Sequence, residues 1–433
     1  MDSDPKPRPA ERRDLLVWLS LATVGIAVTS LALALDARLG TTSLPFLGRY
    51  APQLSVAVLP PITVATGVLI LAWKSGLERL PWAGVLTVGY TGALCWAVSL
   101  ALTDGVIGIT GPMREPDGVA AAVSDVGGDP HRWLRDFTDD PGTLSSHNRR
   151  RPPGAVLLLW SLHRLGVNHD LALGLLIAAA GAATVPLVLY AVRNASGELT
   201  ARRYLPVLAL APYALWLNHP DVLTAPLGAA MIVAGAWATR HRGWPAVVGG
   251  LGSGVLLGFA AMFSYAAAWL GLTVICLYFA RRRPLLNVLT GIGVLIPVLF
   301  AQALGFNWVE GLITAQLDYA RRVEPHRAAA WWAVLSLVAL LLATGPALVA
   351  SLRKLRNTPA WPFLVGAGVA VMFAALAGFA RGGVEHAWLA FFPWLTVAAV
   401  APEHQAGPPV PSPLLLAAVG AVSAVVLAVA LDL

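Results

Sequence analysis

The stretch DPHRWLRDFTDDPGTLSSHNRRRPPGAVLLLWSLHRLG, Asp129–Gly166, is a polar island with long apolar runs on both sides. It combines carboxylates, histidines, an arginine cluster and a Pro-Pro-Gly turn, and the sequence becomes apolar again at Ala155. Of the 433 residues, 57% are hydrophobic and 12% are charged, and the mean hydropathy is +0.69. Ordinary soluble domains carry roughly 25% charged residues. The chain is therefore predicted to be a polytopic membrane protein.

The apolar runs predict an all-α bundle of about 11–13 transmembrane helices, because a membrane-crossing helix needs about 20 mostly apolar residues. No soluble domain is indicated, so residues 1–433 are expected to form a single transmembrane domain. The predicted spans are Leu15–Leu35, Leu54–Trp73, Trp82–Leu102, Leu171–Val192, Tyr204–Leu217, Val222–Thr239, Val247–Ala280 with a break at Phe263–Tyr265, Leu285–Leu304, Trp331–Ala350, Phe363–Phe379, Trp388–Val400 and Leu414–Leu431.

The short loops between these spans are basic, for example Arg281–Arg283, which indicates the cytoplasmic side. This rule places the N-terminus inside and predicts a multi-pass protein of the plasma membrane. Two longer segments, 103–153 and 305–328, then become extracytoplasmic loops with surface helices. Ala155–Leu165 is too short to span and suits a helix at the outer interface. Topology also explains the excess of Lys and Arg (30) over Asp and Glu (23) without a nucleic-acid partner.

Most carboxylates and histidines that are not in cytoplasmic turns fall on the predicted outer side. Asp36 follows the first span directly, where partial desolvation would suit a general base; the alternative is a carboxylate that merely ends the helix in water. Asp139 and Asp140 would hold a divalent ion or simply face water, and no other cofactor is indicated. The further substrate-site candidates, for most of which plain solvation is the alternative, are Asp129, Asp136, His147, Asp221, Tyr265 and Glu310.

Arginines mark two other places at the predicted outer edge of the membrane. Arg149–Arg151 precede the Pro-Pro-Gly turn, where their planar guanidinium groups would bind a lipid-linked phosphate or anchor the chain to anionic head groups. Arg381 and Glu385 lie in ARGGVEHAWLAFFPW, on a break between two apolar spans. This pair is either part of a functional site or a structural ion pair.

Three segments together resemble the GT-C membrane glycosyltransferases: HNRRRPPGAVLLLWSLHRLG from His147, GFNWVEGLITAQLDYA from Gly305 and ARGGVEHAWLAFFPW from Ala380. Within that class they are similar to the actinobacterial branch related to protein O-mannosyltransferases and methylthioxylose transferases. Arg151 stands where the family usually has histidine before Pro-Pro-Gly. Gly383 and His386 replace the first Glu and the last Arg of an Arg-Gly-Glu-x-Glu-Arg pattern.

The resemblance implies a GT-C-like bundle that transfers a sugar from a polyprenyl-phosphate donor at the extracytoplasmic face. The acceptor would be a glycan, lipid or protein of the cell envelope, and the reaction a single inverting displacement. The family's first-loop base is matched by Asp36, and its donor-phosphate groups by Arg381, Arg151 and Arg150. Two rival interpretations remain: a transporter or flippase for a lipid-linked envelope precursor, which needs polar residues accessible from both faces, and a non-catalytic scaffold.

Overall fold

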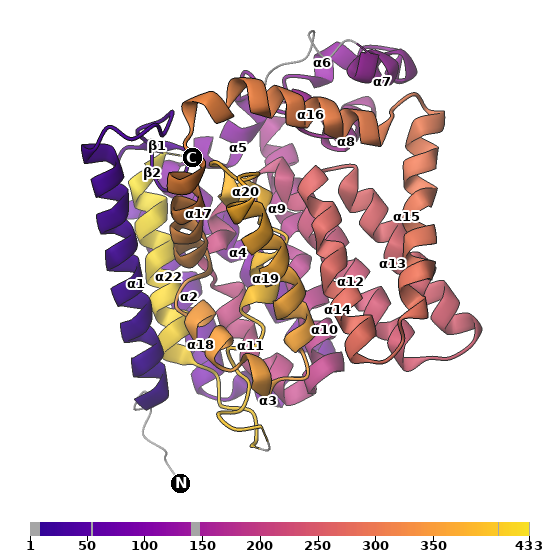
Figure 1. Cartoon of the computed structure of the whole chain (residues 1–433). Helices are drawn as coiled ribbons and strands as arrows, with labels where there is room; N and C mark the ends of the chain where they lie inside the picture. Colours follow the sequence, from indigo (N-terminus) through magenta and orange to yellow (C-terminus); the bar gives the residue numbers. More distant parts are fainter. Residues whose placement is uncertain (1–8, 53–54, 140–147, 406, 433) are drawn as a thin grey trace.

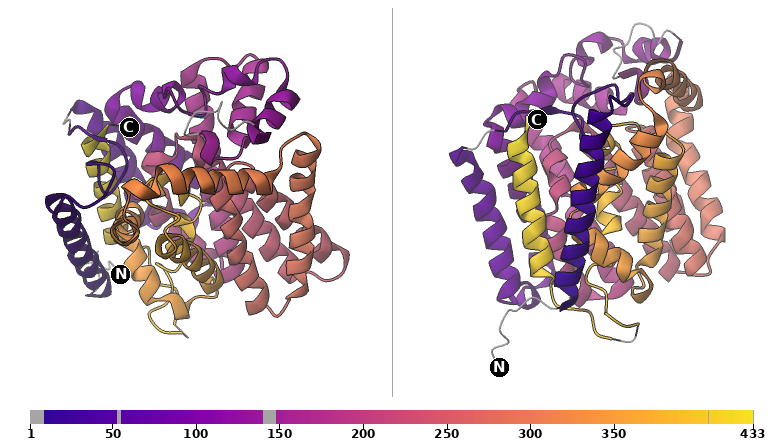
Figure 2. Two further views of the ribbon diagram at one scale, coloured as in Figure 1. Left: turned by 45° about the horizontal axis from the view of Figure 1, so that its top comes forward. Right: turned by 60° about the vertical axis from the view of Figure 1, so that its left-hand side comes forward.

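The structure is a computed structural model that describes residues 9–52, 55–139, 148–405 and 407–432. Its long helices run side by side as a bundle, and the described part of the chain begins at one end of that bundle and finishes at the other (Figures 1 and 2). The N-terminal end is drawn at the bottom of Figure 1, and we call the opposite end of the bundle the upper end.

Seven helical segments of the described chain are long and apolar enough to cross a membrane. This confirms an all-α, multi-pass architecture. The segments contain α1 (Pro9–Ala34), α2 (Leu59–Trp73), α4 (Trp82–Ala101), the pair α9 (Asp170–Ala182) and α10 (Thr184–Ser196), α12 (Thr224–Arg240), α13 (Trp244–Ala261) and α15 (Leu285–Ala303).

One bent pair of helices and three shorter apolar segments also belong to the bundle. α16 (Trp308–Arg322) and α17 (Ala329–Thr344) are separated by a bend of 98°, and together they would make an eighth span. The shorter apolar segments contain α14 (Gly271–Ala280), α19 (Trp361–Leu376) and α22 (Leu414–Ala430). The predicted break at Phe263–Tyr265 is confirmed, because α13 ends at Ala261 and a 3-10 turn, Tyr265–Leu270, leads into α14.

Among the residues that the structure describes, fewer helices of full spanning length are present than the 11–13 predicted, and two predicted spans explain part of the difference. The span predicted at 204–217 is α11 (Glu198–Ala209) followed by a 3-10 turn. The span predicted at 388–400 is not a continuous helix, because α20 (Val384–Ala387) ends just before it and the four-residue α21 (Phe392–Leu395) is its only helical piece. Residues 388–401 are all buried. Irregular backbone is tolerated at membrane depth when protein surrounds it.

Glycines allow some of these helices to touch through their backbones. A Cβ on Gly254 of α13 would lie 2.0 Å from the Thr290 carbonyl oxygen of α15. A Cβ on Gly293 of α15 would lie 2.2 Å from the Leu251 carbonyl oxygen. Small residues at such contacts are the usual means of close helix packing in membranes.

The predicted outer loops, 103–153 and 305–328, both lie at the upper end, where α16 crosses the bundle (Figure 1). The first carries α5 (Ile107–Arg114), α6 (Val123–Val126), α7 (Pro130–Asp139) and a 3-10 turn at Asn148–Arg150. The short helix expected after Pro-Pro-Gly is α8 (Gly154–Arg164). The Gly154 N–H donates to the Met262 carbonyl at 2.9 Å, so the arginine turn is held against the break that follows α13.

Smaller contacts join distant parts of the chain at each end. At the upper end, β1 (Arg49–Tyr50) pairs antiparallel with β2 (Leu431–Asp432), a pairing that the sequence did not predict. At the lower end, which carries α3 (Gly76–Arg79) and α18 (Ala347–Arg353), Arg353 holds the two oxygens of the buried Asp14 at 2.8 Å each. These contacts fix α1 and α22 to the rest of the bundle.

Candidate functional site

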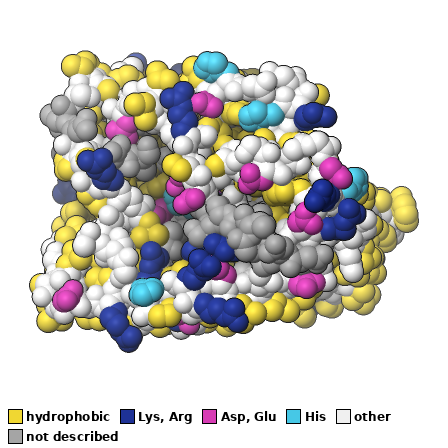
Figure 3. All heavy atoms as spheres, turned by 90° about the horizontal axis from the view of Figure 1, so that it is seen from above, with side chains coloured by type: hydrophobic (Ala, Val, Ile, Leu, Met, Phe, Trp, Pro, Cys, Tyr) yellow, Lys and Arg dark blue, Asp and Glu magenta, His cyan; other side chains and the backbone are white. Residues whose placement is uncertain are grey.

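A polar cavity of about 440 Å³ opens at the upper end of the bundle. Its walls come from α16, the arginine turn before α8, the start of α12, the break after α13 and the glycine turn before α20. Figure 3 looks down on this end, where basic, acidic and histidine side chains gather. The charged and hydrogen-bonding residues that line the cavity are Glu115, Arg150, Arg151, His219, Asp221, Thr224, Ser264, Tyr265, Gln316, Tyr319, Arg327 and His386.

Asp318 of α16 anchors the arginine turn to the surface helix. Its side chain is 10% exposed and lies 3.2 Å from Arg150 Nε, 3.8 Å from Arg149 Nε and 2.9 Å from Arg322 Nε. One carboxylate thus faces three guanidinium groups. The cluster keeps an excess of positive charge beside the cavity, which suits an anionic ligand.

Asp221 is the centre of a second cluster, on the wall formed by the turn before α12. Its Oδ1 forms an ion pair with Arg151. Its Oδ2 lies 3.2 Å from His219 Nδ1 and 3.8 Å from His386 Nδ1, and the centroids of the two imidazole rings are 4.3 Å apart. This group brings together an arginine, a carboxylate and two histidines that are far apart in the sequence.

Arg381, predicted to bind the donor phosphate, is not among the residues that line the cavity. Its guanidinium is 3.2 Å from Glu324 Oε2 and donates to the Arg327 carbonyl at 2.9 Å. Its backbone N–H donates to the Tyr319 hydroxyl at 2.8 Å. Arg381 therefore holds the 324–327 turn in place, and it is Arg327 that faces the cavity.

Steric constraints explain why two glycines follow Arg381. Gly382 and Gly383 have φ of +103° and +72°, in the left-handed region that strains other residues. A Cβ on Gly382 would also lie 2.7 Å from Arg327 Nη1. The Arg-Gly-Gly sequence thus lets the Arg327 side chain pass close to the backbone on its way to the cavity.

Glu385 lies behind the cavity wall, fully buried. Its Oε1 accepts a hydrogen bond from the Leu47 N–H at 2.9 Å. Its Oε2 accepts none from the described residues. Burial raises the pKa of this carboxyl to about 7.

Four of the predicted site residues line the cavity: Arg150, Arg151, Asp221 and Tyr265. Asp36 does not; it lies beyond the end of α1 with its side chain exposed and φ of +47°. No other part of the described chain covers this side chain, and both the desolvation by the membrane and the role as base stay predictions.

The remaining predicted residues lie elsewhere. Asp129 accepts a hydrogen bond from the Arg132 N–H at the start of α7, and Asp136 faces the Arg132 side chain at 3.7 Å. These two acids and Glu310, in the first turn of α16, are exposed. His147, Asp140 and the side chain of Asp139 lie outside the described residues.

Several residues that line the cavity, among them His219 and Arg327, were not predicted from the sequence. The Asn218–Asp221 turn contains both His219 and Asp221 within three positions, a spacing that could have indicated a polar site. Arg327 gave no such signal, because its loop also contains Arg321 and Arg322. Its place in the cavity depends on the bend between α16 and α17.

Two further pockets share walls with the polar cavity. One, of about 330 Å³, is mostly apolar and includes Trp269 and Trp308. It shares six residues with the cavity: Tyr265, Ala266, Gln316, Phe379, Gly382 and Ala387. The other, of about 340 Å³, shares four residues with the cavity: Leu47, Glu115, His219 and His386. Glu115 thus stands where the cavity meets the second pocket.

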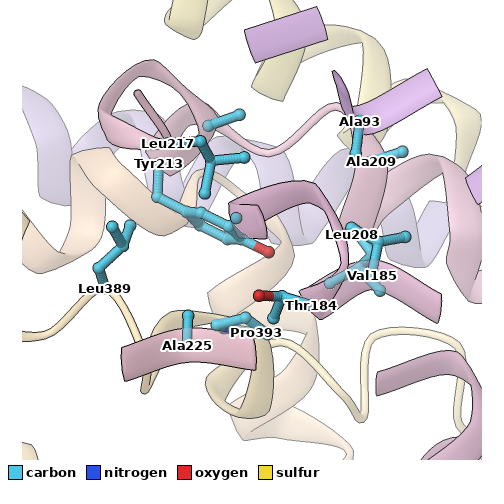
Figure 4. Close-up of a pocket in the computed structure, with 12 residues that line it drawn as sticks. Ala93, Thr184, Val185, Leu208, Ala209, Tyr213, Leu217, Ala225, Leu389 and Pro393 are labelled. Atoms are coloured by element: carbon cyan, nitrogen blue, oxygen red, sulfur yellow. The ribbon is translucent and has the colours of Figure 1, made fainter. Parts of the chain in front are cut away.

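A much smaller internal space lies between α4, α10, α11 and the Pro212–Trp216 turn (Figure 4). It measures about 10 Å³, close to the minimum for one water molecule. The hydroxyls of Thr184 and Tyr213 are buried beside it and make no hydrogen bond among the described residues. This space is too small for a substrate.

No protein-family model matches the chain, and no curated protein matches it. Among solved structures, the chain is similar in fold to the crystal structure of ArnT from Cupriavidus metallidurans in the apo state, with 15% sequence identity and a TM-score of 0.44. The similarity covers 63% of this chain and 54% of that chain. The chain thus matches about half the length of that protein.

Proposed function

We propose that the chain is a membrane glycosyltransferase that moves a sugar from a polyprenyl-phosphate donor to a hydroxyl of a cell-envelope acceptor. This proposal rests on one observation: a positively charged cavity adjoins an apolar pocket. The polar cavity is lined by three arginines and shares part of its wall with the mostly apolar pocket of about 330 Å³. A ligand with an anionic head and an isoprenoid chain fits such a pair of surfaces.

The donor would lie across the boundary between the polar cavity and the mostly apolar pocket. Arg150 and Arg327 would bind its phosphate, since guanidinium groups match phosphate oxygens in charge and geometry. Trp269 and Phe379, which are 42% and 49% exposed, offer apolar surface to the isoprenoid chain. Tyr265 and Gln316 belong to both walls and would lie near the sugar phosphate.

The acceptor would approach through the other pocket, where Glu115 is the carboxylate at the junction. Glu115 would take the proton of the acceptor hydroxyl as its oxygen bonds to the anomeric carbon of the sugar. The bond between that carbon and the phosphate oxygen breaks, and polyprenyl phosphate leaves with its charge stabilised by the arginines. The upper end would then face the extracytoplasmic side.

The decisive experiment is a transfer assay with the purified full chain, a panel of polyprenyl-phosphate sugars and envelope acceptors. We expect a glycosylated product and release of polyprenyl phosphate with one donor class. Glu115→Gln should lower the rate about 10²–10⁴-fold, the usual effect of losing a general base. Glu310→Gln is the matched control, because Glu310 is another exposed glutamate at this end, outside the cavity.

The same assay decides between the two candidate bases. Asp36→Asn should leave the rate unchanged if Glu115 is the base, and abolish it if the resemblance-based assignment is right. Translocation of a lipid-linked sugar in proteoliposomes, without transfer with any donor, would overturn the proposal in favour of a flippase.

A further inference from the structure

Three potential metal ligands converge on one wall of the polar cavity. One ligand atom from each of His219, Asp221 and His386 lies within 4.8 Å of the other two. The side chains of His219, Asp221 and His386 are 12%, 11% and 22% exposed. All three residues also line the cavity, so a position beside them faces the space where a ligand would bind.

The distances between these atoms suit ligands that share one ion. Zinc binds imidazole nitrogen and carboxylate oxygen at about 2.0–2.2 Å in tetrahedral geometry, which places neighbouring ligand atoms about 3.3–3.5 Å apart. The two nitrogens lie 3.2 Å and 3.8 Å from Asp221 Oδ2. The distance of 3.8 Å is too long for a direct hydrogen bond.

The hydrogen bonds around the cluster also accommodate a cation. The Asp221 N–H donates to His219 Nδ1 at 3.3 Å, which corresponds to the tautomer in which this nitrogen offers a lone pair. The same nitrogen is 3.2 Å from the buried Asp221 Oδ2. In that tautomer a cation beside the two atoms would satisfy both, as a proton on Nδ1 does in the other tautomer.

We propose that His219, Asp221 and His386 bind a divalent cation of the zinc type. Two imidazoles and one carboxylate, with a further position open to a cavity, form the donor set of many zinc sites that bind a substrate or water. This site differs from the one suggested by the sequence, where Asp139 and Asp140 were the candidates.

The ion would act on the donor phosphate, a role that rests on the proposed function. Arg151 already balances the charge of Asp221, so the ion adds uncompensated positive charge to a wall near Arg150 and Arg327. An anionic phosphate in the cavity would offset this charge and occupy the open position. Cation and phosphate should therefore bind cooperatively.

The test is a metal titration of the full chain, purified in detergent without a polyhistidine tag and stripped with a chelator. We expect one Zn²⁺ per chain by elemental analysis, and tighter Zn²⁺ binding by calorimetry when farnesyl phosphate is present. His386→Gln and Asp221→Asn should each weaken Zn²⁺ binding by more than about 10-fold, since even loss of groups around the ligands has that effect.

His404→Gln is the matched control, because His404 is exposed and lies outside the cavity. Size exclusion and melting temperature must show that each variant is folded. A chain that takes up no Zn²⁺, or variants that keep the full affinity, would overturn the proposed site. Full transfer activity in metal-free protein would show that the reaction does not need the ion, and it would still support the proposed transferase. Bound Zn²⁺ without transfer from any donor would support the metal site and contradict the proposed transferase.

Discussion

Glu385 Oε1 accepts a hydrogen bond from the Leu47 N–H at 2.9 Å, and this bond joins the loop after α1 to α20. Leu47 lines the polar cavity and its neighbouring pocket, whereas Glu385 is fully buried behind them. The carboxylate therefore supports one wall of the site without being part of its surface. Its burial has a consequence for stability.

Glu385 should make the stability of the protein depend on pH. Burial raises the pKa of Glu385 from 4.5 to about 7 in the folded chain. Between these values the folded state binds more protons than the unfolded state, so the free energy of unfolding falls as pH rises. The contribution is fully present below about pH 4.5 and is lost by about pH 7, and it amounts to about 3 kcal/mol.

Glu385→Gln removes this titration and keeps an oxygen that can accept from Leu47. We expect the variant to melt at a higher temperature than the parent chain at pH 8, and the difference to shrink or reverse at pH 5. Melting curves in detergent at the two pH values measure this. Glu310→Gln, at an exposed position, serves as the control and should show no such pH dependence. An equal shift at both pH values would contradict the assigned pKa.

Arg327 should contribute to donor binding more than to turnover. Arg327→Lys keeps the charge but loses the planar fork, and it also changes the contact with the Trp332 ring, whose centroid is 5.0 Å from the guanidinium carbon. A lost charged hydrogen bond is worth about 1.5–3 kcal/mol, so KM for the polyprenyl-phosphate sugar should rise about 10–150-fold with little change in kcat. Arg132→Lys on the exposed face of α7 is the control. A fall in kcat alone would place Arg327 in the chemical step instead.

Asp318 should stabilise the docking of α16 on the arginine turn. Asp318→Asn leaves Arg149, Arg150 and Arg322 without their shared carboxylate. Because Arg322 is 56% exposed, solvent screens part of the loss, and we expect about 1–3 kcal/mol of destabilisation. Protease cleavage near α16 should become faster, which limited proteolysis can measure. Asp136→Asn, which affects one exposed ion pair, should leave the cleavage rate unchanged.

The sequence predicted the helical bundle well because apolar runs and basic turns follow directly from the thickness of the membrane. It also predicted the break after α13, where Phe263-Ser264-Tyr265 interrupts the apolar run. It failed at 388–400, because an apolar run cannot distinguish a helix from irregular backbone that other helices surround. Four predicted residues line the cavity, whereas Arg381 does not and Arg327, which was not predicted, does. The place of Arg381 depends on hydrogen bonds to backbone carbonyls, which no residue pattern reveals.

Gly154 should be needed to place the arginine turn. A Cβ at this position would lie 2.4 Å from the Met262 carbonyl oxygen, so Gly154→Ala must move α8 away from the break after α13. We expect about 1–3 kcal/mol of destabilisation, the usual cost of overpacking, and weaker binding of the donor phosphate because Arg150, like Arg151, shifts with the turn. Melting temperature and donor KM measure the two effects. Gly252→Ala in α13 is the matched control, since nothing lies within 4 Å of its added Cβ, and it should melt at the same temperature or slightly higher. If Gly154→Ala behaved like Gly252→Ala, the contact with Met262 would not be what positions Arg151.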